Sequence, residues 1–287
     1  MRVGILILCL CASAFSMRVA VKELLPPDSF SENYLVLVSS GEVLELSPSE
    51  AETLSDINWA IENNEQVEID VKESRVKSNF NRSTIETTRL ISLREETDEE
   101  NLDDYIPTPL DNYNVASAVN TNVIKQMFLF LRKDLNPDSQ CYNRAQIWVH
   151  DLATKFLPNR TINLGKMWLF FTKRYIREFN YKWWFHVSPY TYLKGDPSEI
   201  MLDRTYHHSP RRFTRWKNMF MKNNAPCTEV KYYSHYNNNQ EAAYCYTIKS
   251  SMYYYQPYQI ENLEKGHKQR RGFLQNELEL AYKDALR

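Results

Sequence analysis

Glycine is scarce in this chain, with 6 glycines among 287 residues. The glycine-rich loops that cradle nucleotide phosphates are missing, since neither GxGxxG nor GxxxxGK[ST] occurs. CxxC and HExxH spacings are also absent, and the six histidines are scattered, so we expect no metal and no cofactor. No internal apolar run is long enough to span a bilayer, and no membrane span is expected.

The first residues are typical of a secretory signal. Arg2 is followed by the apolar run 3–10 and then by small residues up to Ser16, where we expect cleavage. The sequence therefore predicts a signal peptide over 1–16 and a secreted or periplasmic protein. Three cysteines remain after cleavage, an odd number for an oxidising compartment. Cys227 and Cys245 flank a polar, turn-rich stretch and are the expected disulfide, which leaves Cys141 as a free thiol.

Charge divides the chain into two opposed parts. Residues 17–110 carry 21 acidic and 8 basic side chains, whereas residues 111–287 carry 15 acidic and 26 basic ones. The basic part alone would suggest nucleic acid. The acidic part offers an intramolecular partner instead, so we expect no nucleic acid. We expect an acidic pro-domain over 17–75, an exposed linker or activation segment over 76–105, and a catalytic domain over 106–287.

Local patterns predict a mixed architecture. Strands are expected at 34–38, 42–46 and 67–71, with a helix between the last two that starts with a capping box at Ser47 and Glu50. This gives a small ββαβ pro-domain. In the basic part we expect helices over 118–131, from Ser139, over 209–221 and over 261–286. Strands are expected at 166–172, 180–193, 199–203, 232–236 and 243–255.

Three chemically complementary residues follow one another in the basic part. Cys141 falls in the first turn of a helix that Asp138 or Ser139 can cap, where the unpaired backbone N–H groups and the helix dipole favour a thiolate. His186 lies in an alternating strand, and Asp203 ends an apolar run. A thiol, a base and a carboxylate that orients the base form a catalytic triad. Each residue alone has a simpler structural explanation, as a buried thiol, a core histidine or a turn residue.

The same segments resemble the bacterial secreted protein-glutaminases, which deamidate protein-bound glutamine. The matching pieces are CYNRA at 141–145, WWFHVSP at 183–189 and Leu202-Asp203, with Trp216 following. The resemblance implies an α+β fold with a papain- and transglutaminase-like core, in which a catalytic helix packs on an antiparallel sheet. It also implies a Cys141-His186-Asp203 triad and an N-terminal pro-segment. Arg204 stands where the family tends to have proline, and the 261–287 tail looks additional.

The resulting prediction is a pro-enzyme that converts exposed glutamine in proteins or peptides to glutamate and ammonia, and that a separate activating protease cleaves. The aromatic residues Trp183, Trp184 and Tyr190 are candidates for substrate binding, although core packing explains them equally well. A transglutaminase or cysteine peptidase with the same triad is the alternative among enzymes. A secreted, non-catalytic binding module is the alternative outside them.

Overall fold

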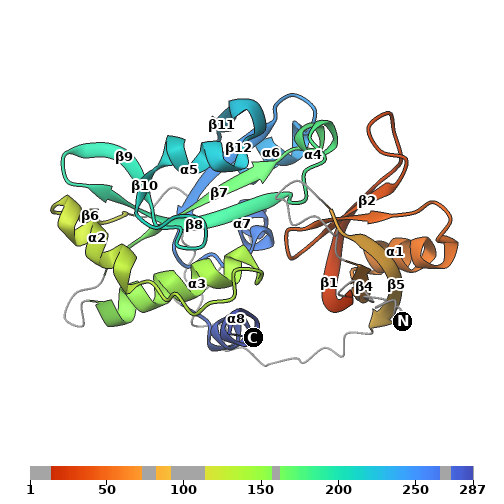
Figure 1. The fold of residues 1–287 in the computed structure, drawn as a ribbon, viewed down its shortest axis with the longest axis horizontal. Helices are drawn as coiled ribbons and strands as arrows, with labels where there is room; N and C mark the ends of the chain where they lie inside the picture. The colour runs from red at the N-terminus through yellow and green to blue at the C-terminus, as the bar shows by residue number, and fades with distance from the viewer. Residues whose placement is uncertain (1–13, 73–81, 92–113, 157–161, 266–272, 287) are drawn as a thin grey trace, which may run out of the picture. The chain divides into compact units, whose positions relative to one another are not determined.

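The computed structural model describes residues 14–72, 82–91, 114–156, 162–265 and 273–286. The chain divides into two compact units (Figure 1). The N-terminal unit contains residues 1–96 together with 177–183, and the C-terminal unit contains 97–176 and 184–287. The boundary between them lies inside the predicted linker. Among the described residues, no helix combines the length and the apolar character that crossing a bilayer requires.

The N-terminal unit is a closed barrel with strand order β1-β2-β3-β5-β4 and one helix, α1. Alternation along β4 buries Val67, Ile69 and Val71 in the barrel core, as the sequence predicts. The helix contributes Ile57 to the same core. The element bounds are β1 Ala14–Leu25, β2 Tyr34–Val38, β3 Val43–Leu46, α1 Ala51–Asn63, β4 Gln66–Lys72 and β5 Thr84–Ile91.

The predicted ββαβ arrangement is incomplete, because β1 and β5 also belong to the barrel. Strand β5 lies within 76–105, the segment predicted to be an exposed linker. Ile85 is its buried apolar residue, and polar cross-strand contacts such as Thr87 with Asp70 help to hold it. Strand β5 therefore forms without the apolar alternation by which a strand is recognised in the sequence. The rest of the predicted linker, and residues 1–13 of the predicted signal peptide, lie outside the described residues.

The predicted start of α1 is wrong. The helix begins at Ala51 with Glu50 as its N-cap, and no side chain caps it. The Ser47 hydroxyl instead contacts Ser49, within the turn that precedes the helix. The polar turn uses the serine that a capping box would need.

The C-terminal unit is built on a mostly antiparallel, seven-stranded sheet of order β10-β9-β8-β7-β12-β11, with β6 paired to β8. Every residue of β7 is buried, which explains its continuous apolar run. Strand β8 pairs with β7 so that His186 lies opposite Leu169. The bounds are β6 Ser117–Ala118, β7 Gly165–Phe171, β8 Phe185–Leu193, β9 Asp196–Met201, β10 Arg211–Arg212, β11 Cys227–Glu229 and β12 Cys245–Ser251.

Seven α-helices accompany this sheet in the described residues. Helix α3 contacts β8, and α8 contacts α3 (Figure 1). The segment 232–236, predicted as a strand, is part of helix α6, and the predicted terminal helix 261–286 is replaced by α7 and α8. The bounds are α2 Thr121–Phe130, α3 Cys141–Asp151 with a π-helical turn at Leu152–Phe156, α4 Lys173–Glu178, α5 Phe213–Phe220, a short 3-10 turn at Lys222–Asn224, α6 Tyr233–Asn238, α7 Pro257–Glu264 and α8 Gln275–Ala285.

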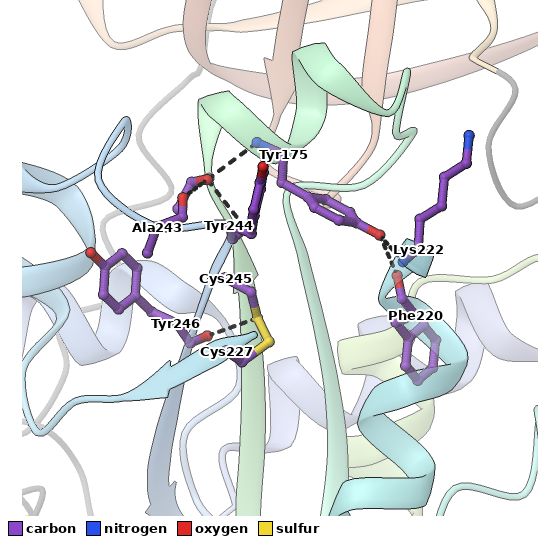
Figure 2. The surroundings of a disulfide bond; sticks show 9 residues. Tyr175, Phe220, Lys222, Cys227, Ala243, Tyr244, Cys245 and Tyr246 are labelled. Carbon is purple, nitrogen blue, oxygen red and sulfur yellow. Dashed lines mark hydrogen bonds between the residues drawn. A yellow bond between two sulfur atoms is a disulfide. The ribbon is translucent and has the colours of Figure 1, made fainter. Parts of the chain in front are cut away.

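A disulfide joins Cys227 to Cys245, as the sequence predicts (Figure 2). The two cysteines are register partners on the adjacent parallel strands β11 and β12. Nearby, the buried Tyr175 hydroxyl donates to the Phe220 carbonyl at 2.8 Å and accepts from the Lys222 N–H at 2.6 Å. These bonds connect α4 to the end of α5, so hydrogen bonds between helices hold the surroundings of the disulfide.

Candidate active site

The candidate nucleophile, Cys141, lies in the first turn of a helix as predicted, and it is the first residue of α3, two residues after the predicted start at Ser139. Gln140 is the N-cap, in place of the predicted Asp138 or Ser139, and its side chain makes no capping bond. Cys141 is the free cysteine of the described residues and is 3% exposed. As the first N–H of a helix, its backbone amide has no acceptor within the helix. The thiol therefore lies beside a helix N-terminus, where negative charge is favoured.

His186 and Asp203 converge on this thiol from the sheet. His186 lies on β8, and Asp203 lies two residues beyond β9. The Leu202 N–H donates to the Pro189 carbonyl at 2.9 Å, which keeps the segment after β9 beside β8. His186 Nε2 is 2.8 Å from Asp203 Oδ2, and the imidazole also hydrogen-bonds the Cys141 side chain. The structure thus brings all three predicted residues into contact in the order sulfur, imidazole, carboxylate.

The electrostatics of this trio favour a charged imidazole. Burial alone would lower the pKa of His186, but its hydrogen bonds to Asp203 and Cys141, and the negative charges on both, raise the pKa to about 9. Burial would raise the pKa of Asp203, but its hydrogen bonds with His186 and Trp216 and the charges of His186 and Arg144 lower it overall. Both groups therefore carry charge at neutral pH.

Three aromatic residues lie around the imidazole, and of these Trp216 belongs to the segments that carry the resemblance. The Trp216 indole N–H donates to Asp203 Oδ2 at 2.9 Å, which fills a second site on the oxygen that faces His186. The Phe220 ring lies 4.3 Å from the imidazole centroid, and Tyr206 meets it edge-on at 5.3 Å. Trp216 and Phe220 are four residues apart on α5, a spacing that places both on one helix face.

Arg144 is a second residue whose role the sequence did not reveal. It is 2% exposed and lies one turn after Cys141 on α3. Its guanidinium donates to the Pro137 carbonyl at 3.1 Å and also to the Ser139 carbonyl. It therefore ties the loop before Cys141 to the helix after it, and its charge contributes to the lowered pKa of Asp203.

The three aromatics predicted to bind substrate have different surroundings. Trp184 is buried and stacks on Phe170, and its carbonyl accepts from the Phe171 N–H. Tyr190 is buried over Gly165, where a Cβ would fall 2.2 Å from its ring. Trp183 forms a β-bridge with Glu42 inside the N-terminal unit. Core packing accounts for Trp184 and Tyr190, and substrate binding by the three stays a prediction.

Metal ligands do not cluster in the part of the chain that the structure describes. Within those residues, no group of three or more His, Cys, Asp or Glu side chains is arranged to hold a metal ion. The paired histidines, His207 and His208, follow Asp203 on the same connection between β9 and β10.

Comparison with known proteins gives a match to one family model and a similar fold. Residues 117–220 match the model of a family described as glutaminase, and this segment contains all three residues of the trio. No curated protein sequence matches the chain.

Three solved structures are similar to the chain. A crystal structure of pro-protein-glutaminase aligns with a TM-score of 0.50 and 13% identity over 93% of this chain and 90% of its own. A mutant of pro-protein-glutaminase aligns with a TM-score of 0.49, 12% identity and 84% coverage of both chains. The NMR structure of protein-glutaminase from Chryseobacterium proteolyticum aligns with a TM-score of 0.38 and 14% identity over 59% of this chain and 89% of its own. The resemblance suggested by the sequence is confirmed.

Proposed function

From the glutaminase family to which residues 117–220 belong, we propose that this protein is a protein-glutamine deamidase with Cys141 as its nucleophile. One observation carries the proposal, which is the continuous contact from the Cys141 side chain through His186 to Asp203. A nucleophile, a base and an orienting carboxylate in hydrogen-bond reach are what acyl transfer requires. The fold match to a pro-protein-glutaminase supports the same assignment.

In the first half-reaction the Cys141 sulfur attacks the side-chain carbonyl carbon of a glutamine. With Nε2 engaged by Asp203, Nδ1 of the charged His186 already holds the proton of the thiol, so the Cys141 sulfur attacks as a thiolate. The resulting imidazolium is stabilised by the buried carboxylate, in line with its pKa of about 9. The Cys141 N–H at the helix start can hold the oxyanion. The proton then passes from His186 to the amine, ammonia leaves, and a thioester remains.

In the second half-reaction water replaces the thiol. His186, now neutral, removes a proton from water, and the hydroxide adds to the thioester carbonyl. Collapse of this adduct releases glutamate, and the sulfur leaves as a thiolate beside the His186 imidazolium, which restores the resting site. Asp203 keeps one tautomer and one ring orientation throughout, because its Oδ2 holds Nε2 while Trp216 holds Oδ2. Acceptance of an amine instead of water would make the same enzyme a transglutaminase.

The test is ammonia release from casein by the wild type and by Cys141→Ala. We expect release by the wild type, with conversion of glutamine to glutamate in the product's mass spectrum, and no release by the alanine variant. Crosslinks to lysine would identify a transglutaminase, and chain cleavage a cysteine peptidase. Release that persists in Cys141→Ala would refute the assignment. A chain without any of these activities, whose Cys141 does not react with iodoacetamide, is a binding module.

We propose further that the barrel of the N-terminal unit is a pro-segment. Its acidic composition complements the basic C-terminal part, and the same unit includes residues 177–183 of the proposed catalytic part, which lead directly into β8 and His186. The fold match to pro-protein-glutaminase extends over 93% of the chain and so includes this unit. Cleavage in the acidic stretch after β5 by a separate protease would then activate the enzyme.

The pro-segment proposal predicts that limited proteolysis in the acidic stretch raises the rate of ammonia release. Equal rates before and after a cut at this place would contradict it. The disulfide and the signal-like first residues support a secreted or periplasmic location for both events.

A further inference from the structure

The end of the last helix, α8, meets the loop that precedes Cys141. Asp284 Oδ2 accepts a hydrogen bond from the backbone N–H of Gln140 at 3.1 Å and another from Asn143 Nδ2 at 2.6 Å. The next carbonyl, of Ala285, accepts from the Asn136 N–H at 2.7 Å. The end of α8 therefore holds the loop at Asn136 and at Gln140, and it holds the first turn of α3 through Asn143.

Asn143 is held from its other side as well. Its Oδ1 accepts a hydrogen bond from the Tyr255 hydroxyl, and both residues are buried. With its oxygen bound by Tyr255 and its nitrogen bound by Asp284, the amide has one orientation. Tyr255, Asn143 and Asp284 thus form a chain of hydrogen bonds across the start of the nucleophile helix. A buried network with each member bonded makes the local geometry rigid.

We propose that Asp284 is a positioning residue for the nucleophile, and this inference rests on the proposed deamidase function. Asp284 bonds the residues on both sides of Cys141 in the first turn, Gln140 and Asn143. It therefore fixes where the sulfur lies relative to the imidazole of His186. Catalytic geometry is sensitive to displacements of about 1 Å, which can cost ~100-fold in rate. A carboxylate at a helix N-terminus also satisfies an unpaired N–H with favourable charge.

A second contact between the same two helices provides the matched control. The Tyr282 hydroxyl donates to Asp151 Oδ1 at 3.0 Å, at the opposite end of α3 from Cys141. Both contacts attach α8 to α3, but only the one through Asp284 touches the first turn. Tyr282→Phe should therefore weaken the attachment without moving the nucleophile.

The experiment compares Asp284→Ala, Asp284→Asn and Tyr282→Phe in the full chain, all treated with protease as the wild type is. Rates of ammonia release are expressed per folded molecule, with the folded fraction taken from the amplitude of the thermal unfolding transition, so that unfolded protein is not counted. We expect Asp284→Ala to lower kcat about tenfold, the equivalent of one lost hydrogen bond to a charged group, with KM unchanged. Asp284→Asn should recover most of kcat, because its amide oxygen can accept the same two bonds. Tyr282→Phe should keep the wild-type kcat.

A merely structural role gives a different result. In that case Asp284→Ala and Tyr282→Phe would both lower the melting temperature, and kcat per folded molecule would stay at the wild-type value in both. That outcome, or a failure of Asp284→Asn to recover activity, would overturn the inference. Asp284→Ser replaces the alanine variant if the latter does not fold.

The rate of Cys141 alkylation separates this inference from the proposed function. If the wild type releases no ammonia, the deamidase assignment fails, but the alkylation rate still reports the position of the thiol beside its base. A slower alkylation in Asp284→Ala than in Asp284→Asn then supports positioning. Equal rates in the wild type and the three variants would refute it.

Discussion

Trp216 gives Asp203 its second hydrogen-bond donor and shields the carboxylate from water. The indole is fully buried and lies on α5, whereas the other donor, His186, lies on β8. Two donors from different elements fix the carboxylate oxygen in place. A carboxylate that could rotate would also allow the imidazole to rotate. Trp216 therefore acts on the orientation of His186 through Asp203.

Replacement of this donor tests its contribution at the scale of one residue. Trp216→Phe removes the indole N–H and keeps an aromatic ring, and we expect it to lower the free energy of unfolding by about 1–3 kcal/mol. We also expect kcat for ammonia release to fall about tenfold. Urea denaturation and initial rates measure the two effects. Trp59→Phe, at an exposed tryptophan of α1, is the control and should change neither. An unaltered kcat in Trp216→Phe would show that His186 alone orients Asp203.

The raised pKa of His186 predicts how the protein responds to alkaline pH. Since the pKa is raised from 6.5 to about 9 in the folded chain, the charged imidazole stabilises the fold fully below about pH 6.5. This contribution is lost as the pH rises through about 9. We expect the rate of ammonia release to fall over the same range, because His186 must donate a proton to the departing amine.

Denaturation at pH 6.5 and at pH 10 checks the stability part. The difference in unfolding free energy between the wild type and His186→Gln should be larger at the lower pH. His208→Ala, at an exposed histidine of the same unit, should show no such dependence. A difference that grows with pH would mean that His186 is neutral in the folded protein.

At the scale of elements, Arg204 connects the segment that carries Asp203 to α2. Its Nη1 donates to the carbonyls of Phe128, Leu129 and Leu131 at 2.6–2.7 Å, at the C-terminal end of the helix. A cation there satisfies unpaired carbonyls and complements the helix dipole. Proline, expected at this place from the resemblance, has no donor side chain. The arginine thus provides this chain with an attachment between α2 and the residue after Asp203.

Loss of this attachment should destabilise the C-terminal unit. We expect Arg204→Ala to lower the free energy of unfolding by about 1–3 kcal/mol, because three carbonyls lose a charged donor. The midpoint of urea denaturation should fall while its slope is unchanged. Lys133→Ala, at an exposed cation near the same helix end, is the control. Equal midpoints for the two variants would show that solvent satisfies the carbonyls equally well.

The elements that the sequence predicts correctly are those with their own periodic signal. Alternation at 67–71 and the apolar residues 167–171 of the strand predicted at 166–172 give β4 and β7, and the helix predicted from Ser139 begins at Cys141. Strand β5 is not predicted from the sequence, because pairing with β4 and polar cross-strand contacts hold it rather than an apolar alternation of its own. The strand predicted at 232–236 is wrong, because residues 233–236 belong to helix α6. Their tyrosines have high β propensity, but tertiary packing overrides it.

The candidate site divides in the same way. Cys141, His186 and Asp203 were predictable because each bears a reactive group in a recognisable segment, and the structure joins them. Arg144 and Asp284 act through hydrogen bonds to backbone and amide groups distant in sequence, and those partners leave no local pattern. Supporting residues of this kind become visible only when the chain is folded.

At the scale of the whole molecule, Arg82 ties the N-terminal barrel to residues 177–183. Its side chain is 2% exposed, pairs with Glu45 and donates to the Tyr181 carbonyl at 3.0 Å. The Val43 N–H donates to the Lys182 carbonyl at 2.8 Å beside it. The barrel thus holds a segment that stays covalently attached to β8. A cut in the acidic stretch after β5 leaves these bonds intact.

We therefore expect a nicked chain to remain one particle at first. On size exclusion after limited proteolysis, the two fragments should co-elute, and Arg82→Ala should make them separate faster, because its bonds to Glu45 and Tyr181 are lost. Arg89→Ala is the control, since this arginine pairs with Glu68 on the barrel surface with 77% of its side chain exposed. Immediate separation of wild-type fragments would show that the peptide bond alone holds them.

The sulfur chemistry of the chain sets a practical condition for handling it. In the proposed mechanism the sulfur of Cys141 is required as a free thiol, whereas the sulfurs of Cys227 and Cys245 are joined where an edge strand meets its neighbour. Reductants added to preserve the first would attack the second, and oxidants that secure the second would inactivate the first. Storage buffers therefore call for a mild, well-defined thiol-to-disulfide ratio, with activity and free-thiol content followed together.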